Sequence, residues 1–439
     1  MTSNDTIIAP ATPFGYSGIA VIRISGPSAF SYLSTLSGKK TFKNREATVS
    51  SITDNNSTLI DRCLVTAFYG PRSYTGDDLV EVSTHGNPAI VDELVRAFCH
   101  LGARPAGAGE FTQRAFLNGK MDLIQVEAVA SLIHSKSIEN SRCQHKILTG
   151  SLSIIINDIR KKLISLLSQF EYQMDLSEEE THGDYGSNLL SELTSILVTT
   201  NEFEKSFYLG RLLNRGASVV IAGTPNVGKS SLLNYLSGSS RAIVSDVPGT
   251  TRDTIEVELV IGGVPVLFVD TAGIRESEDL IEKEGVSRAK ERANSADLII
   301  SLTDNPQSEH LHYNKTPALK VVNKLDLRQS KKTEDGVIHI SVKRGLGFSF
   351  LNEKISLALG INKISTDETY LSTARQHRAM VDCSFFVKKA LTLTKQKTLD
   401  LELLSFEVRA ALTSVDEILG KTTSEDILNN VFGSLCVGK

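Results

Sequence analysis

Hydrophobic and polar residues follow short, strand-like patterns in the first quarter of the chain. Aliphatic and β-branched side chains cluster in residues 19–24 and 79–82, which predicts β-strands. Apolar residues at helical spacing over 92–98 predict an α-helix. Glycine and proline residues punctuate this region. Residues 1–119 are therefore expected to form an N-terminal α+β domain.

From about residue 120, apolar residues recur every three or four positions, which is the period of long amphipathic helices. One such run, 152–170, precedes an acidic stretch over 177–186 that we expect to be a solvated turn. The pattern resumes over 189–209 and is predicted to stop near Gly210. Residues 120–210 are therefore expected to be the first segment of a helical domain.

The helical period returns after residue 365. It is clearest over 401–419, and Gly420 follows as an expected helix C-cap. Thr422 and Glu425 have the spacing of a capping box, which would open a last short helix. Residues 366–439 are therefore expected to be the second segment of the helical domain.

Residues 211–365 alternate short apolar strands with helical stretches, the pattern of a mostly parallel sheet. The simplest architecture is multidomain, with α/β and purely α parts. In this architecture the α/β domain is inserted into a helical domain that is made of two sequence segments. Such an insertion is well tolerated when the two termini of the inserted domain lie close together.

The composition narrows the class of protein further. The chain has 439 residues, of which 41% are hydrophobic and 22% charged, so collagen-like, disordered and membrane classes are excluded. No run approaches the roughly 18 apolar residues of a membrane span, and the first residues lack signal-peptide features. A cytoplasmic location is the default. The net charge of −4 argues against a broad polyphosphate-binding surface, and the five scattered cysteines argue against disulfides or zinc.

The most informative segment is a glycine-rich loop after a β-branched run, 217–222. Its pattern is Gly223-x-x-x-x-Gly228-Lys229-Ser230, and a helical pattern follows. Glycines let backbone N–H groups close around phosphate oxygens, and the helix N-terminus adds positive potential. Lys229 would reach the β- and γ-phosphates, and the Ser230 hydroxyl would ligate Mg²⁺. The other expected nucleotide contacts of this loop are Asn226, Val227, Gly228 and Ser231.

Three further motifs follow apolar runs in the order that a GTPase requires. Asp270 at a predicted strand end can hold the Mg²⁺ shell, and Gly273 can approach the γ-phosphate. The Asp326 carboxylate can accept the ring N–H and the amine of guanine, a donor pair that adenine lacks. Asn323-x-x-Asp326 therefore disfavours a P-loop ATPase. The full motifs are Asp270-Thr271-Ala272-Gly273, Asn323-Lys324-Leu325-Asp326, and Ser341-Val342-Lys343, which is suited to covering the base. Together they predict a Ras-like guanine-nucleotide-binding domain.

The residues alone do not determine which side chain orients the water that attacks the γ-phosphate. Ile274 stands where many GTPases place a water-orienting glutamine, and the charged residues over 275–284 offer several replacements. Thr251, on the polar loop 245–253, is the natural second Mg²⁺ ligand. The Asn226 carbonyl could ligate a monovalent cation or belong to an ordinary turn.

The chain resembles the bacterial tRNA modification GTPase family MnmE (TrmE) over essentially its whole length. The nucleotide motifs are shared by many GTPases, whereas the N-terminal block and the tail are specific to this family. The segments that carry the resemblance are 5–7, 9–13, 23–26, 75–78 with Glu81, 109–120 and 436–439.

The resemblance implies a cytoplasmic homodimer, formed through the N-terminal domain, which also binds 5-formyl- or 5,10-methylene-tetrahydrofolate. It implies a complex with the FAD-binding protein MnmG, in which a carboxymethylaminomethyl or aminomethyl group is added at C5 of the wobble uridine of certain tRNAs. It also implies Mg²⁺-dependent GTP hydrolysis coupled to K⁺-dependent pairing of two nucleotide domains.

The resemblance also implies residue roles. Arg23, Glu81, Lys120 and Lys439 fall at folate-contacting positions. Ser230 and Thr251 become Mg²⁺ ligands, and Glu282 becomes the catalytic residue that orients the attacking water. The K⁺ ligands are the Asn226 side chain and loop oxygens of Ser245, Val247 and Thr250. The whole nucleotide-contacting loop is Ser245, Asp246, Val247, Pro248, Gly249, Thr250 and Thr251.

Departures and alternatives accompany the resemblance. Ser245 stands where threonine is frequent, and Leu435 replaces the usual phenylalanine before the last cysteine, which puts ring stacking there in doubt. Cys436 is either a nucleophile or a buried tail cysteine. The alternative function is a ribosome-assembly type of regulatory GTPase, an RNA-binding switch. It would need a basic appendage, which a pI of about 6.2 argues against.

Overall fold

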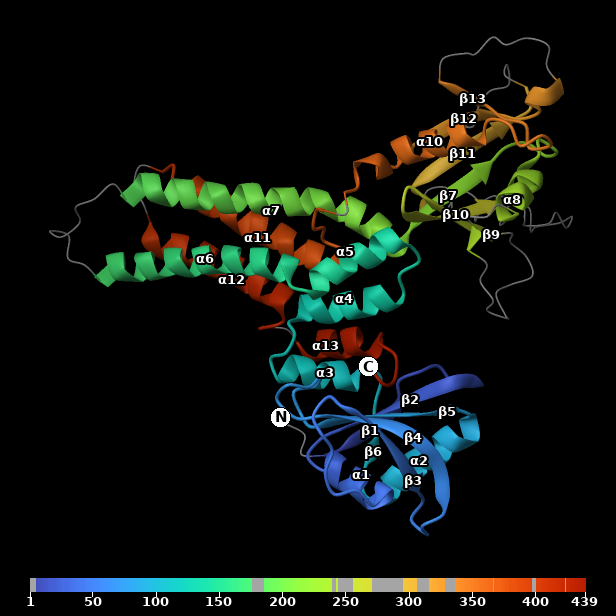
Figure 1. The fold of residues 1–439 in the computed structure, drawn as a ribbon. Helices are drawn as coiled ribbons and strands as arrows, with labels where there is room; N and C mark the ends of the chain where they lie inside the picture. The colour runs from blue at the N-terminus through green and yellow to red at the C-terminus, as the bar shows by residue number, and fades with distance from the viewer. Residues whose placement is uncertain are drawn as a thin grey trace, which may run out of the picture. The chain divides into compact units, whose positions relative to one another are not determined.

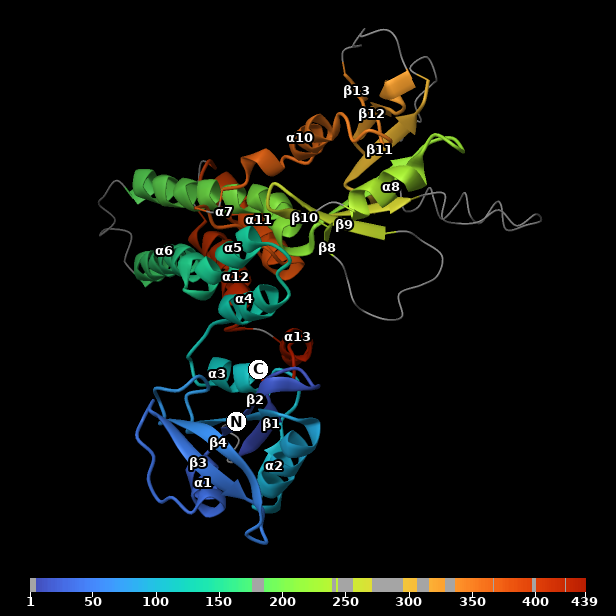
Figure 2. The ribbon, with the colours of Figure 1, turned by 45° about the vertical axis from the view of Figure 1, so that its right-hand side comes forward.

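The computed structural model describes residues 5–175, 185–238, 242–243, 256–270, 295–305, 316–327, 336–365, 367–396, 400–422 and 424–439. Figures 1 and 2 show the helices and strands of the chain, coloured from the N-terminus to the C-terminus. The chain divides into two compact units, each built from separated stretches of sequence. The first contains Met1–Ile133, Ile147–Gly183 and Leu393–Lys439, and the second contains His134–Lys146 and Asp184–Thr392.

The first unit begins with an α+β domain, as the sequence predicts. Its six-stranded sheet has the order β3-β4-β5-β2-β1-β6 and is antiparallel except for the β1–β6 pair. Ile22, Leu33, Leu94 and Phe98 are fully buried in the core that the sheet forms with its two helices. The elements are β1 Ile7–Pro10, β2 Ser17–Ser25, α1 Ala29–Ser37, β3 Ala47–Thr53, β4 Leu59–Phe68, β5 Leu79–Gly86, α2 Pro88–His100 and β6 Arg104–Pro105.

Helices complete the first unit. α6 and α12 lie side by side, and Arg160 Nε donates to Asp416 Oδ1 across them at 2.5 Å. The helix predicted over 401–419 is confirmed, and Gly420 caps it with φ of 82°. The helices are α3 Glu110–Leu117, α4 Leu123–Ile133, α6 Ser151–Asp175, α12 Leu401–Leu419 and α13 Glu425–Gly433.

The predicted capping box at Thr422 is wrong. The N-cap of α13 is Ser424, whose side chain makes no capping hydrogen bond. The reason is that the backbone N–H of Lys421 still bonds the Asp416 carbonyl and completes the end of α12. The chain at Thr422 therefore belongs to the link between two helices, and the next helix starts only at Glu425.

The second unit contains the longest described helix, α7, at Tyr185–Arg215. The prediction that this helix stops near Gly210 is wrong, because it continues to Arg215 and Gly216 follows with φ of 84°. Gly210 serves close packing instead: a Cβ there would lie 2.0 Å from the Leu371 carbonyl oxygen. Of the predicted turn over 177–186, residues 177–184 lie outside the described part of the chain.

The α/β domain in this unit has a seven-stranded sheet of order β13-β12-β11-β7-β10-β9-β8. Its strands pair in parallel except where β9 meets β10 and β8, so the predicted mostly parallel sheet is confirmed. The strands are β7 Ala217–Ala222, β8 Ala242–Ile243, β9 Glu256–Ile261, β10 Val264–Asp270, β11 Leu298–Thr303, β12 Ala318–Val322 and β13 Val337–His339. The helical elements of the second unit besides α7 are α5 Ile138–Leu148, α8 Lys229–Ser237, η2 Leu325–Leu327, α10 Phe348–Ala358, η3 Ile361–Lys363 and α11 Ala374–Leu393.

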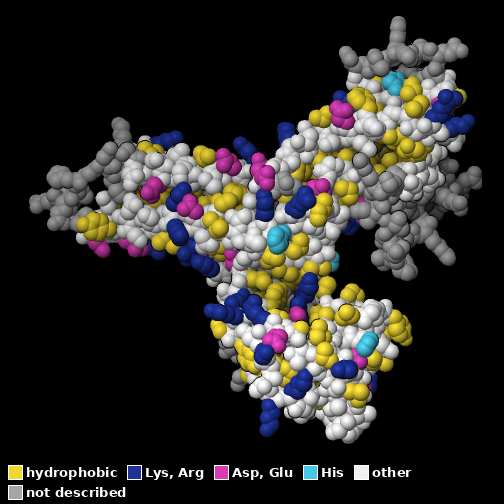
Figure 3. Space-filling model, in the orientation of Figure 1, with side chains coloured by type: hydrophobic (Ala, Val, Ile, Leu, Met, Phe, Trp, Pro, Cys, Tyr) yellow, Lys and Arg dark blue, Asp and Glu magenta, His cyan; other side chains and the backbone are white. Residues whose placement is uncertain are grey.

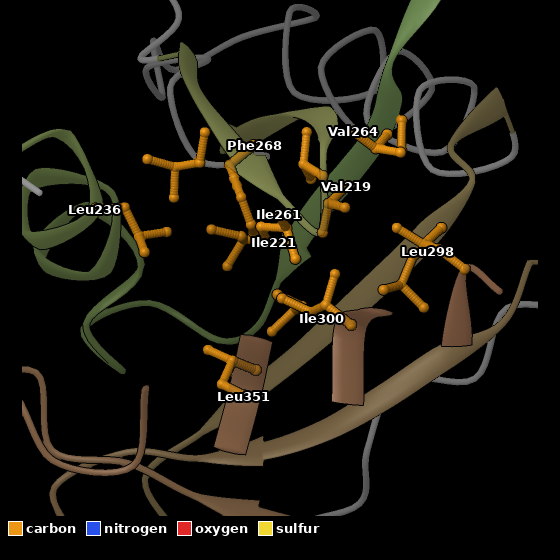
Figure 4. Close-up of a cluster of buried hydrophobic side chains, with 14 of the residues drawn as sticks. Val219, Ile221, Leu236, Ile261, Val264, Phe268, Leu298, Ile300 and Leu351 are labelled. Carbon is orange, nitrogen blue, oxygen red and sulfur yellow. The ribbon is translucent and has the colours of Figure 1, made fainter. Parts of the chain in front are cut away.

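Aliphatic side chains from the strands and helices of this domain form one core (Figure 4). Val219 and Ile221 on β7, Phe268 on β10 and Ile300 on β11 are fully buried there, together with Leu351 from α10. Because β7 is the central strand, its carboxyl end is held rigidly, and the glycine-rich loop begins at that end.

Two further observations concern the charged side chains on the surface and the possibility that a helix crosses a membrane. Lys, Arg, Asp and Glu side chains are all present on the face drawn in Figure 3. None of the helices in the described ranges has both the length and the apolar character needed to cross a bilayer.

Candidate functional site

The glycine-rich loop joins β7 to α8, and its shape depends on its glycines. A Cβ at Gly223 would lie 2.2 Å from the Leu302 carbonyl oxygen, and one at Gly228 would lie 2.5 Å from Asn323 Nδ2. Gly228 also has φ of 101°, which side chains disfavour. α8 starts directly after Gly228, so its unpaired N–H groups and positive dipole end face this loop.

Lys229 lies across the loop. It is only 6% exposed, and its Nζ donates to the carbonyl oxygens of Gly223 at 2.9 Å and Thr224 at 3.1 Å. Its hydrogen-bond partners are two neutral carbonyl groups, so neither of these contacts is an ion pair with a carboxylate. The loop thus presents one cation and a helix N-terminus together, which suits the phosphates of a nucleotide.

A pair of oxygen groups stands at the start of α8. The Ser230 hydroxyl donates to Asp270 Oδ2 at 3.2 Å, and Asp270, the last residue of β10, is 2% exposed. Mg²⁺ prefers a carboxylate and other oxygen ligands together with phosphate oxygens. Ser230 and Asp270 therefore fit the predicted magnesium site.

Asn323 connects the phosphate side of the site to the base side. Its Nδ2 donates to the Val227 carbonyl at 3.0 Å, and its Oδ1 accepts from the Val342 N–H at 3.2 Å. Asn323 is 4% exposed. One buried side chain therefore fixes three of the predicted motifs relative to one another.

The predicted base-reading carboxylate is also held in place. Ser341 Oγ donates to Asp326 Oδ1 at 2.5 Å, and the Arg344 N–H donates to Ser341 Oγ at 3.3 Å. The Ser341 hydroxyl lowers the pKa of Asp326, with smaller contributions from the nearby charges of Arg344 and Lys343. Asp326 is therefore ionised at neutral pH and can accept two N–H donors, as guanine requires.

Several predicted residues lie outside the described part of the chain. They are Ser245, Asp246, Val247, Pro248, Gly249, Thr250, Thr251, Thr271, Ala272, Gly273 and Glu282. Among the residues that are described, no group of three or more His, Cys, Asp or Glu side chains could hold a metal ion by itself.

A second cluster lies on the N-terminal domain, within the first unit. Arg23 on β2 donates from Nε to Glu81 Oε1 on β5 at 2.8 Å, and its NH1 contacts the Gly438 carbonyl at 3.4 Å. The Arg23 and Glu81 side chains are 21% and 28% exposed. The Arg23 guanidinium also lies 5.5 Å from the ring centroid of Tyr74. Two predicted folate contacts thus meet beside the residue that precedes Lys439.

The C-terminal tail is fixed against the N-terminal domain. Val437 forms a β-bridge with Ala108, and a Cβ at Gly438 would lie 2.1 Å from the Pro10 carbonyl oxygen. Leu435 is 4% exposed, so it anchors the tail in an apolar cluster. Cys436 is exposed, which excludes the buried alternative for this cysteine.

Lys120 is placed differently from the other predicted folate contacts. Its Nζ donates to the Pro71 carbonyl at 2.9 Å, on the connection between β4 and β5. The connection that contacts Lys120 also carries Tyr74, the residue beneath Arg23.

Three residues of these sites were missed by sequence reasoning. Asp304 pairs with Lys324 Nζ at 2.7 Å, Tyr74 lies under Arg23, and Gly438 supplies a carbonyl to it. An acid directly after β11 is a usable signal for Asp304, because the carboxyl ends of parallel strands meet at one edge. Tyr74 and Gly438 carry no such signal, since their roles depend on a fold that joins the two chain ends.

A phosphate-binding loop at the central strand of a parallel sheet, with a carboxylate set to read guanine, defines this chain as a P-loop GTPase. Family models match two ranges: GTP-binding protein TrmE N-terminus over residues 6–120, and MnmE helical domain over residues 123–436. The chain belongs to the MnmE (TrmE) family of tRNA modification GTPases. It is a GTP hydrolase tied to tRNA modification.

Relatives match at full length. The tRNA modification GTPase MnmE of Legionella pneumophila (strain Corby) is 38% identical over 452 residues, and that of Acetivibrio thermocellus is 37% identical over 460 residues. Each match covers 100% of both chains.

Solved GTPase structures match part of the chain. Era of Aquifex aeolicus bound to GDP and aluminium fluoride is 25% identical, with a TM-score of 0.26, over 41% of this chain and 68% of Era. The G domain of the T. maritima FeoB iron transporter is 25% identical, with a TM-score of 0.24, over 32% of this chain and 98% of that one.

Proposed function

We propose that this GTPase is stimulated by K⁺ and acts as a cytoplasmic homodimer with the FAD-binding protein MnmG. Together they add a carboxymethylaminomethyl or aminomethyl group at C5 of the wobble uridine of certain tRNAs. The one-carbon unit comes from 5-formyl- or 5,10-methylene-tetrahydrofolate. Membership of the family supports GTP hydrolysis in tRNA modification, and the two residue clusters support the finer assignments.

The first cluster is proposed to bind GTP and Mg²⁺. Lys229 would exchange its two carbonyl partners for β- and γ-phosphate oxygens, and Asp326 would select guanine. Ser230 and Thr251 would hold Mg²⁺, with Asp270 supporting its shell, and the ion neutralises charge that develops on the phosphates. Glu282 would orient the attacking water.

K⁺ is proposed to supply further positive charge near the phosphates, the part that an arginine finger plays in other GTPases. Asn226 supports this assignment because it is exposed on the phosphate-binding loop with φ of 63°, so its amide oxygen is accessible to an ion. Backbone oxygens of Ser245, Val247 and Thr250 would complete the set.

The second cluster is proposed to bind the tetrahydrofolate. The glutamate carboxylates of folate suit Arg23 and Lys439, and the pterin N–H groups suit Glu81. Lys120 would add a cation from the β4–β5 connection. The exposed thiol of Cys436 is then a candidate nucleophile beside the same tail.

The observation that carries the folate assignment is the contact of the Arg23–Glu81 pair with the Gly438 carbonyl. It builds a half-buried, charged site from residues near both ends of the sequence, and these residues belong to the first unit, whereas the nucleotide motifs belong to the second. No described feature favours the alternative of an RNA-binding switch.

Calorimetry with 5-formyltetrahydrofolate tests this proposal. We expect Arg23→Ala to weaken binding at least about tenfold, because a charge-assisted contact contributes about 1.5–3 kcal/mol. Its GTP hydrolysis should stay at the wild-type rate. Arg96→Ala is the matched control, since Arg96 pairs only at the surface with Glu93 at 3.6 Å. Equal affinity of wild type and Arg23→Ala, or no heat with the wild type, would contradict the proposal.

A further inference from the structure

One hairpin of the nucleotide-binding sheet carries the nucleotide motifs at one end. β9 and β10 pair antiparallel from Glu256–Val269 to Ile261–Val264. β10 ends at Asp270, the partner of Ser230, and β9 starts at Glu256, which comes after the predicted ligand loop 245–253 in the sequence. β10 is also paired with β7, whereas β9 is bordered on its other side, within the described residues, only by the two-residue β8. The pairing with β10 and the buried side chains of Val257, Leu259 and Ile261 hold β9 in the sheet. Contacts from outside the sheet add to this support.

Helix α5 and the residues just before it provide such a contact. Lys136 Nζ donates to both carboxylate oxygens of Glu258 on β9, at 2.8 and 2.9 Å. The Glu258 side chain is 15% exposed and the Lys136 side chain is 53% exposed, so the pair is shielded from water on its carboxylate side. Glu258 lies in the middle of β9, opposite Leu267.

The turn of the hairpin meets the same helix. Gly263 has φ of 84°, and a Cβ there would lie 2.5 Å from Glu139 Cγ and 2.8 Å from Glu139 Cβ. On the other side of the turn, a Cβ at Gly262 would lie 2.7 Å from Ile361 Cγ2. The two glycines therefore let the turn fit between α5 and η3.

Helix α5 is itself anchored in this unit. Cys143 is 5% exposed and belongs to the core that also contains Ile261 and Val264 from the hairpin. Lys146 pairs with Asp367 at 3.2 Å. Residues 134–146 accordingly group with the nucleotide-binding unit, although residues 133 and 147 belong to the other one.

We propose that α5 is a positioning element for GTP hydrolysis. Lys136 and Glu139 hold β9 and the hairpin turn, and thereby the strand that leads out of the predicted metal-ligand loop. Nucleotide affinity rests on other contacts, namely the glycine-rich loop, Asn323 and Asp326. The proposal therefore predicts a loss of hydrolysis rate without a loss of GDP affinity.

Charge reversal of the ion pair is the first test, measured as single-turnover GTP hydrolysis and GDP affinity of the full chain. Lys136→Glu and Glu258→Lys should each slow hydrolysis about three- to tenfold, because like charges replace a partly shielded pair. The double reversal should restore the rate to within about twofold. GDP affinity should stay within about twofold throughout.

Lys162→Glu is the matched control, because it reverses a lysine that pairs with Asp158 at 3.1 Å on α6. It should leave the hydrolysis rate unchanged. If Lys136→Glu matches this control, if the double reversal stays as slow as the single variants, or if GDP affinity falls in step with the rate, the proposal is overturned.

A glycine pair provides an independent test that leaves charge unaltered. Gly263 and Gly336 have φ of 84° and 85°, but nothing lies within 4 Å of a Cβ at Gly336. Gly263→Ala and Gly336→Ala thus carry the same backbone strain, and only the former pushes the turn away from α5. Slower hydrolysis in Gly263→Ala alone, at unchanged GDP affinity, is expected. Equal rates in both variants would count against the role of α5.

Discussion

Replacing Asn323 should affect both stability and nucleotide affinity, because this one buried side chain joins the glycine-rich loop to the base-binding segments. Its amide donates to the Val227 carbonyl at 3.0 Å and accepts from the Val342 N–H at 3.2 Å. Asn323→Ala removes both bonds at once. Because Asn323 is 4% exposed and Val227 is 2% exposed, water cannot readily replace the donor that the Val227 carbonyl loses.

The magnitude follows from the two bonds. A net hydrogen bond contributes about 0.5–1.5 kcal/mol, and an orphaned buried group costs about 1–3 kcal/mol. The Val342 N–H is half-buried and recovers part of its loss from water. We therefore expect the free energy of unfolding to fall by about 2–3 kcal/mol. GDP affinity should fall at least about tenfold, because the loop and base segments are no longer preorganised.

The assay combines urea unfolding with fluorescent GDP titration. Asn234→Ala is the matched control, because Asn234 is an exposed asparagine on α8 and its loss should change stability by less than about 0.5 kcal/mol. Asn323→Asp tests the direction of the bond, since it would set an oxygen against the Val227 carbonyl and should be no more stable than the alanine variant. Wild-type stability and affinity in Asn323→Ala would refute the reasoning.

Further predictions concern the base, the pH dependence and a helix cap. Asp326→Asn should shift preference from GTP to XTP, measured by competition, because xanthine has a carbonyl where guanine has an amine. Burial alone would raise the pKa of Asp61, but hydrogen bonds from Thr84 and others lower it to about 2. The pKa of Asp61 in the folded protein lies below its ordinary value of 3.8, so the ionised carboxylate should contribute about 1–2 kcal/mol to the free energy of unfolding above pH 4. In an acid titration of stability this contribution should be lost between pH 4 and 2, and Asp61→Asn should not show this loss. In thermal unfolding, Gly420→Ala should cost about 2–3 kcal/mol, and Gly38→Ala only about 1 kcal/mol. Both residues have positive φ, but only the former meets a neighbour, Leu123 Cβ, 2.8 Å from its added Cβ; equal costs would contradict this.

The nucleotide site could be predicted from the sequence because its chemistry is local. Each motif follows a strand, and parallel strands bring their carboxyl ends to one edge, so the order of motifs already determines which residues meet. The structure accordingly joins Ser230 to Asp270 and Asn323 to Val227 by direct hydrogen bonds. The inserted sheet was predictable for the same reason.

The errors have long-range causes. Gly210 looked like a helix end, but it lies inside α7 because the Leu371 carbonyl approaches it from a segment far away in sequence. The cluster of Arg23, Glu81 and Gly438 could not be derived from patterns, since it needs the chain ends to meet. Only the resemblance to a known family pointed to its residues. The role proposed for α5 could not be predicted from the sequence, because the ion pair between residues 136 and 258 joins positions that are far apart in the sequence and belong to no common pattern.

The central claim is that GTP bound at the loop ending in Ser230 drives a change in tRNA. Mass spectrometry of wobble uridines tests it most directly, in cells that lack this chain and in the same cells carrying either the wild type or Lys229→Ala. The account predicts that C5-aminomethyl-type nucleosides disappear without the chain, return with the wild type and stay absent with Lys229→Ala. Unchanged wobble uridines in cells without the chain would contradict it, as would full recovery with Lys229→Ala.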